Sequence, residues 1–106
     1  MTTFDRREEG FENKFAHDEE MKFKAEARRN KLLGLWVAEK LGSSGEAASD
    51  YAKTVVATDV DGGEAGVIRK VIADLAAKDV AITEAQIRVR MDELMPQAIA
   101  QVNAGT

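Results

Sequence analysis

The spacing of hydrophobic residues over the first 41 positions predicts one long helix with two different faces. No Pro occurs here and good helix formers dominate, with only Gly10 and Gly34 interrupting the stretch. At about 100° per residue, the first half places three aromatic residues on one narrow stripe: Phe4, Phe11 and Phe15. The second half carries a stripe that is rotated from the first: Met21, Ala25, Leu32 and Trp36. We therefore expect the second half to enter a core and the first half to present a different surface.

The middle of the chain predicts two further helices separated by a turn. Ser43 or Ser44 can cap the N-terminus of a helix over about 44–59. The Asp-Gly-Gly sequence at 61–63 is a turn signal, and the hydrophobic residues that follow it repeat at helical spacing over about 64–78. The turn is therefore expected to end one helix and to precede the next.

The last predicted helix covers about 83–103. Thr83 followed by Gln86 has the spacing of a capping box, and Pro96 is expected to kink the helix or to end it early. No window alternates hydrophobic and polar residues with the period of a strand. The pattern predicts an all-α fold, namely a four-helix bundle with a long first helix and a mobile N-terminal segment. The predicted division is a segment over 1–19 and a bundle over 20–106 with helices at about 20–41, 44–59, 64–78 and 83–103.

Charge separates the N-terminal third from the rest of the chain. Residues 1–31 hold eight basic and eight acidic side chains, whereas the remaining residues hold seven basic and eleven acidic ones, which gives the net charge of −4. Gly10 costs a helix up to about 1 kcal/mol relative to Ala, and three Phe rings bury too little surface to offset the ordering entropy. The segment is therefore expected to be disordered when free and to dock in a groove of a partner protein. The alternative is that its Phe rings extend the core face of the first helix.

Composition argues against several kinds of chemistry. The sequence has no Cys, which excludes disulfides, zinc-thiolate sites and thiol nucleophiles. Its single His, His17, cannot supply the two Glu-x-x-His motifs of a di-iron bundle, and it lies in the segment least expected to be rigid. Residues 59–64 resemble a calcium loop only superficially, because Gly62 comes too early and the twelfth position falls on Lys70. We expect no enzyme activity, no cofactor and no metal.

A local basic cluster is the second candidate site. Its members are Arg28, Arg29 and Lys31. The cluster is either a solvated helix face or, in a helical sensing module, a binding site for a nucleotide or another small anion. A DNA-binding module is disfavoured because the pI is about 5.0 and no helix is strongly basic. His17 is either a solvated side chain or a pH switch.

The sequence also predicts where the protein resides. No apolar run approaches the roughly 20 residues that cross a bilayer, and the N-terminus lacks the apolar region of a signal peptide. We expect a cytoplasmic protein without direct membrane insertion.

Four ungapped stretches carry a resemblance to a known family. KFAHDEE at 14–20 is followed by FKAEARRNKLLGLW at 23–36, and RKVIADL at 69–75 and RVRMDEL at 88–94 fit the same pattern. The sequence resembles the zeta subunit of the F-type ATP synthase of alphaproteobacteria over essentially the whole chain. The middle, at 43–66, resembles the family least.

The resemblance implies an inhibitor of ATP hydrolysis by the catalytic head of the synthase. In the family, a mobile N-terminal segment becomes helical as it enters an interface between the alpha and beta subunits next to the gamma shaft, where it blocks hydrolytic rotation. The protein would lie at the inner membrane only through the synthase. Carried over to matching positions, the resemblance implies these partner-binding residues: Phe4, Arg6, Arg7, Glu8, Phe11, Lys14 and Phe15.

Overall fold

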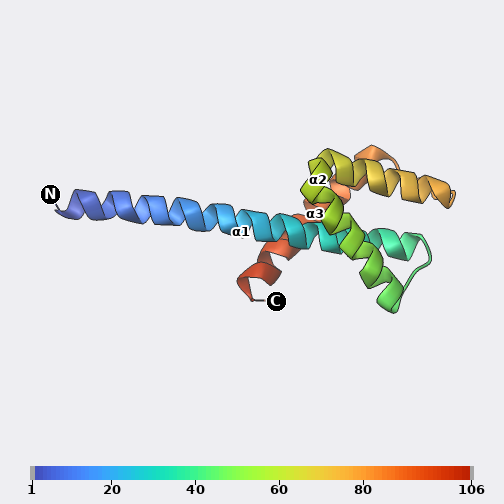
Figure 1. Cartoon of the computed structure of the whole chain (residues 1–106), viewed down its shortest axis with the longest axis horizontal. Helices are drawn as coiled ribbons and strands as arrows, with labels where there is room; N and C mark the ends of the chain where they lie inside the picture. The colour runs from blue at the N-terminus through green and yellow to red at the C-terminus, as the bar shows by residue number, and fades with distance from the viewer. Residues whose placement is uncertain (1, 106) are drawn as a thin grey trace.

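Three helices make up the described part of the chain. The computed structural model describes the backbone of residues 2–105 and the side chains of residues 19–105. Within these limits the helices are α1 (Thr2–Lys40), α2 (Gly45–Ala77) and α3 (Glu84–Asn103), and no strand occurs (Figure 1). The all-α expectation is therefore confirmed.

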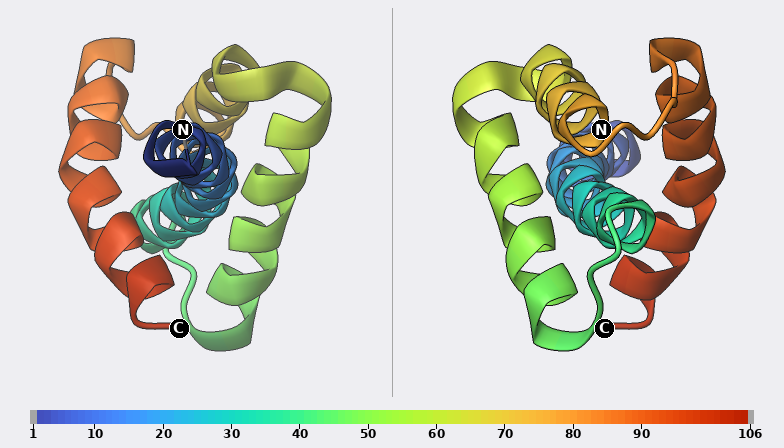
Figure 2. Two further views of the ribbon diagram at one scale, coloured as in Figure 1. Left: turned by 90° about the vertical axis from the view of Figure 1, so that its left-hand side faces the viewer. Right: turned by 90° about the vertical axis from the view of Figure 1, so that its right-hand side faces the viewer.

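Helix α1 lies at the centre of the fold. Figure 2 looks along α1 and shows α2 on one side of it and α3 on the other, while α2 and α3 contact each other at few points. Because α1 is covered on two sides, its buried residues are not confined to the single stripe that the sequence predicted. Leu33 and Val37 are fully buried, whereas Leu32 and Trp36 of the predicted stripe are only partly buried.

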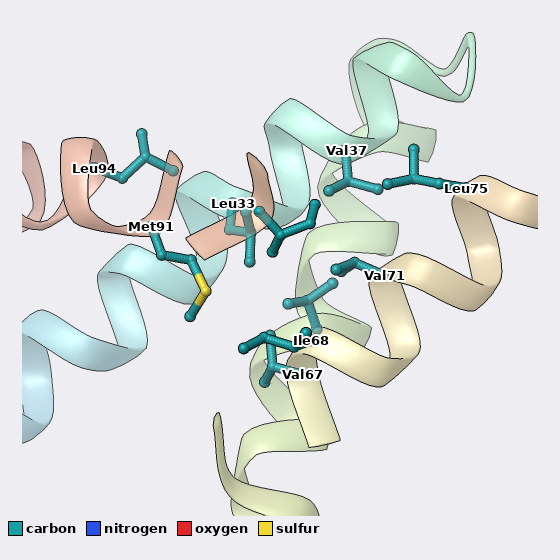
Figure 3. Packing of buried hydrophobic residues seen from close by; sticks show 10 residues of the cluster. Leu33, Val37, Val67, Ile68, Val71, Leu75, Met91 and Leu94 are labelled. Carbon is teal, nitrogen blue, oxygen red and sulfur yellow. The ribbon is translucent and has the colours of Figure 1, made fainter. Parts of the chain in front are cut away.

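The hydrophobic core joins all three helices. Figure 3 shows aliphatic side chains of α2 and α3 gathered around Leu33 and Val37 of α1. The buried cluster is completed by Val55, Val67, Ile68, Val71, Leu75, Ile87, Met91 and Leu94. Gly34 allows α1 and α2 to cross closely, because a Cβ atom added there would lie 2.6 Å from the Cα atom of Ala52.

The prediction of four helices is wrong. The two helices expected at about 44–59 and 64–78 are arms of one bent helix, α2, which continues through the Asp-Gly-Gly sequence. Only Gly63 leaves helical geometry, with φ 64° and ψ −166°, a combination that is essentially restricted to glycine. A single residue therefore provides the bend that is visible in Figure 1 where α2 changes from green to yellow. We call residues 45–62 the first arm and residues 64–77 the second arm.

The start of α3 follows the sequence pattern. The backbone N–H of Gln86 donates to Thr83 Oγ1 at 3.2 Å, and the backbone N–H of Thr83 donates to Gln86 Oε1 at 2.8 Å, which completes the predicted capping box. Ser44 occupies the N-cap position of α2 without a side-chain capping bond. Of the two outcomes expected at Pro96, a kink or an early end, the early end does not occur, because α3 continues to Asn103.

Candidate functional site

The N-terminal half of α1 extends beyond the other helices. Figure 1 shows α1 projecting as a single rod from the packed part of the molecule, which gives principal extents of 65 × 25 × 23 Å. Along α1, the first buried residue among the described side chains is Ala25. The packing of α1 against its neighbours therefore begins well inside the helix.

The seven predicted partner-binding residues all lie on this projecting part. They are Phe4, Arg6, Arg7, Glu8, Phe11, Lys14 and Phe15, and their side chains fall outside the described residues. His17 falls outside them as well. The backbone assigns these positions to α1, so the N-terminal segment and the core of the fold share one helix.

The three residues of the basic cluster have different surroundings in the structure. Arg29 is only 8% exposed; its Nη2 donates to Asn30 Oδ1 at 3.1 Å, and its Nη1 lies 3.8 Å from Glu64 Oε1 of the second arm. Arg28 Nη1 donates to Gln101 Oε1 of α3 at 3.0 Å. Lys31 is exposed to solvent. The three cations therefore do not converge on one point.

Two of these cations nevertheless share a groove of about 490 Å³. Arg28 and Lys31 line it together with the following residues: Phe23, Lys24, Ala27, Val56, Val102 and Gly105. Phe23 is 72% exposed, which makes it the most exposed aromatic side chain among the described residues. The groove combines three cations with an aromatic ring and contains no carboxylate in its lining.

A second groove, of about 520 Å³, lies where α1 leaves the packed part of the molecule. Met21, Lys22 and Ala25 of α1 face the C-terminal part of α3 there, namely Met95, Ile99, Val102 and Asn103. Its lining is mainly apolar, and its Met21 and Ala25 belong to the stripe that the sequence predicted to enter a core.

The two arms of α2 are joined by a polar cluster that the sequence did not indicate. Tyr51 Oη donates to Asp74 Oδ2 at 2.7 Å, and Lys70 Nζ lies 3.1 Å from the same oxygen. Burial raises the pKa of the Tyr51 phenol well above its ordinary value, and the hydrogen bond to Asp74 and the charge of that carboxylate raise the pKa further. Tyr51 and Asp74 are 23 positions apart, so no local motif links them.

Trp36 contacts two cations at the other end of the packed part. Lys40 Nζ is 5.6 Å and Arg90 Cζ is 5.5 Å from the centroid of the Trp36 ring. A groove of about 510 Å³ adjoins these side chains, and its remaining lining comes from Ile82, Ala85, Gln86, Val89 and Glu93. The sequence pattern assigned Trp36 to the core and gave no reason to pair it with Arg90.

Metal binding and membrane crossing find no structural support in the described part of the chain. Residues 19–105 contain no group of three His, Asp or Glu side chains that is arranged to hold a metal ion. None of the described helices is both long enough and apolar enough to cross a membrane.

Comparison with known proteins agrees with the architecture. A solved solution NMR structure is 49% identical to the chain; the alignment covers 81% of this chain and 99% of that one, with a TM-score of 0.69. No curated protein matches the chain. The family described as ATPase inhibitor subunit zeta matches residues 1–101, which include both the projecting part of α1 and the packed helices. This match indicates a regulatory rather than a catalytic role, and it shows that the chain belongs to the ATPase inhibitor subunit zeta family.

Proposed function

We propose that the protein inhibits ATP hydrolysis by the F-type ATP synthase and that residues 1–19 form the inhibitory element. The observation that carries the proposal is the extent of the family match, which includes the N-terminal segment as well as the helices that bury the core. A carrier alone would not need a helix that extends far beyond its packing partners. The remaining residues, 20–106, serve as the anchor of the segment.

The projecting part of α1 is long enough to be inserted between two subunits. Helix α1 has 39 residues, which correspond to about 58 Å at 1.5 Å per residue. Its first buried side chain in the described part is Ala25, so a stretch of roughly 30 Å precedes the packed region. A helix of this length can enter an interface between subunits while the packed helices stay outside it.

The residues of the segment suit a protein interface. Phe4, Phe11 and Phe15 would lose their hydration in an apolar groove between an alpha and a beta subunit, near the gamma shaft. Arg6, Arg7 and Lys14 would pair with subunit carboxylates, and Glu8 with a subunit cation. A helix held there opposes rotation in the direction of hydrolysis. The protein would thus act in the cytoplasm, at the inner membrane only through the synthase.

The experiment is to add the purified full chain to ATP synthase that lacks this subunit and to measure ATP hydrolysis and ATP synthesis separately. Hydrolysis is expected to fall with increasing protein while synthesis is largely retained. A chain shortened to residues 20–106, checked for helical content by circular dichroism, is expected to have lost the inhibition. Equal inhibition by the shortened and full chains would contradict the assignment of the segment.

A second candidate function is the sensing of a nucleotide or another small anion. It is supported by the groove that Arg28 and Lys31 share with Lys24, because three cations and no carboxylate line it. Lys24 also pairs with Glu20 at 3.2 Å, and Arg28 donates to Gln101. Arg29 belongs to the candidate cluster by sequence, although its guanidinium is engaged with Asn30 and Glu64. Chemical shifts of residues around this groove should move on addition of millimolar ATP or ADP; unchanged shifts would contradict this function.

A further inference from the structure

A groove beside Trp36 has the composition of a protein-docking surface. Trp36 and Lys40 come from α1, Val89 and Arg90 from α3, and Ile82 from the loop that precedes α3. Val89 is 58% exposed although it is aliphatic. Trp and Arg are the residues most often found at the energetic centre of interfaces. We refer to this surface as the Trp36 groove.

The cations of the Trp36 groove lack an adequate acidic partner. Both Lys40 and Arg90 lie within 6 Å of the centroid of the same ring, as cation–π contacts require. The single lining carboxylate belongs to Glu93, whose Oε2 is 4.0 Å from Arg90 Nη1. Lys40 forms no ion pair with any other described side chain. A further carboxylate in the groove would therefore give Lys40 an ion pair and Arg90 a second one.

Arg90 offers a specific donor for such a carboxylate. Its side chain is 36% exposed, and its Nη1 lies 4.0 Å from Glu93 Oε2, at the limit of an ion pair. The terminal nitrogens of a guanidinium can donate to both oxygens of a carboxylate. An acidic side chain of a partner that reaches these nitrogens would form a closer ion pair than the one with Glu93.

These observations identify the occupant by its chemistry. We propose that the Trp36 groove docks a segment of the ATP synthase in which a carboxylate lies next to an aliphatic side chain, the carboxylate binding Arg90 and Lys40 and the aliphatic group packing on Val89 and Trp36. The inference rests on the proposed function and adds a second contact to it. Trp36 lies 21 positions after Phe15 on the same helix, about 30 Å along its axis. The groove therefore tethers the protein independently of the inhibitory segment.

Loss of the Trp36 groove contact and loss of the inhibitory segment should change the inhibition curve in different ways. Loss of the tether raises the concentration of protein that gives half-maximal inhibition, because the segment no longer benefits from a high effective concentration. It leaves the inhibition at saturation unchanged, because the segment itself is intact. Loss of the segment lowers the inhibition at saturation.

The test compares two double variants of the full chain that change net charge equally. Lys40→Gln with Arg90→Gln removes both cations of the groove, whereas Lys53→Gln with Arg69→Gln removes two exposed cations that do not line it. The groove variant is expected to need roughly tenfold more protein for half-maximal inhibition and to show a weaker salt dependence of binding. The control variant is expected to resemble the unmodified chain.

A third variant separates loss of binding from loss of folding. Val89→Asp changes an exposed position, leaves Trp36 and both cations in place and puts a carboxylate where an acidic partner would meet it. It is expected to weaken binding to ATP synthase as well, with unchanged circular dichroism. Unmodified chain that inhibits normally, together with groove variants that match the control, would overturn the tether alone. Failure of the unmodified chain to bind the synthase would overturn the proposed function and the tether with it.

Discussion

Tyr51 in the first arm of α2 donates a hydrogen bond of 2.7 Å to Asp74 Oδ2 in the second arm. Lys70 supports the same contact, since its Nζ lies 3.1 Å from Asp74 Oδ2 and 5.1 Å from the centroid of the Tyr51 ring. The cluster links the two arms that meet at the bend at Gly63. The bend is thus held by side chains as well as by glycine geometry.

Removal of the Tyr51 hydroxyl should loosen this cluster. Tyr51→Phe keeps the ring near Lys70 but leaves Asp74 without one of its donors, so we expect a loss of about 1 kcal/mol in the free energy of unfolding. Urea denaturation followed by circular dichroism measures the loss. Asp74→Asn and the double variant complete a cycle in which the two losses should not add. Additive losses would show that the two side chains are not coupled.

The same cluster should make stability depend on alkaline pH. The pKa of Tyr51 is raised in the folded state above its unfolded value near 10, so the neutral phenol is favoured by folding. The contribution is complete below pH 10 and is lost as pH rises from there toward the folded-state pKa. Urea midpoints between pH 8 and pH 11 should therefore fall more steeply for the unmodified chain than for Tyr51→Phe. Parallel curves would contradict this linkage.

The bend in α2 should depend on Gly63 and not on Gly62. Gly63 has a φ of 64° and a ψ of −166°, which cost a side-chain-bearing residue about 1–3 kcal/mol. Gly62 lies in the helix with open space around it, so Ala there should stabilise the protein by up to about 1 kcal/mol. Thermal unfolding of Gly63→Ala and of its matched control Gly62→Ala should therefore shift in opposite directions. Equal shifts would show that the bend is not set at Gly63.

The crossing of α1 and α2 should not tolerate a methyl group at position 34. A Cβ atom of Gly34→Ala would lie 2.6 Å from the Cα atom and 3.0 Å from the Cβ atom of Ala52, so the helices must separate. We expect a loss of about 1–3 kcal/mol. Gly66→Ala is the matched control, because its nearest atom would be the Thr58 methyl carbon at 3.7 Å, an ordinary contact. A neutral Gly34→Ala would mean that the crossing is looser than described.

Local signals in the sequence predicted local structure well. Thr83 and Gln86 indicated the start of α3 correctly because both partners of the capping box lie within one turn. The Asp-Gly-Gly sequence predicted a change of direction at the right place, but it could not show that only Gly63 would leave the helix. A bend and a loop have the same sequence signal, and packing of both arms on α1 decides between them.

Contacts between distant residues could not be predicted in this way. The sequence grouped Arg29 with Arg28 and Lys31, but Arg29 packs against Asn30 and pairs with Glu64 because the bend in α2 brings Glu64 to α1. Trp36 was assigned to the core, and its contact with Arg90 depends on how α3 lies beside α1. The partner-binding residues at the N-terminus stay a prediction that rests on the Phe stripe and on resemblance.

The central claim is that the Phe stripe of the N-terminal segment inhibits ATP hydrolysis. Its most direct test is the ATP hydrolysis rate of the synthase at saturating full chain in which Phe4, Phe11 and Phe15 are replaced by Ala, compared with Phe23→Ala. Phe23 is the matched control because it is exposed on the same helix but lies outside the segment. We predict that the triple variant loses most of the inhibition and that Phe23→Ala retains it. Full inhibition by the triple variant would contradict the account.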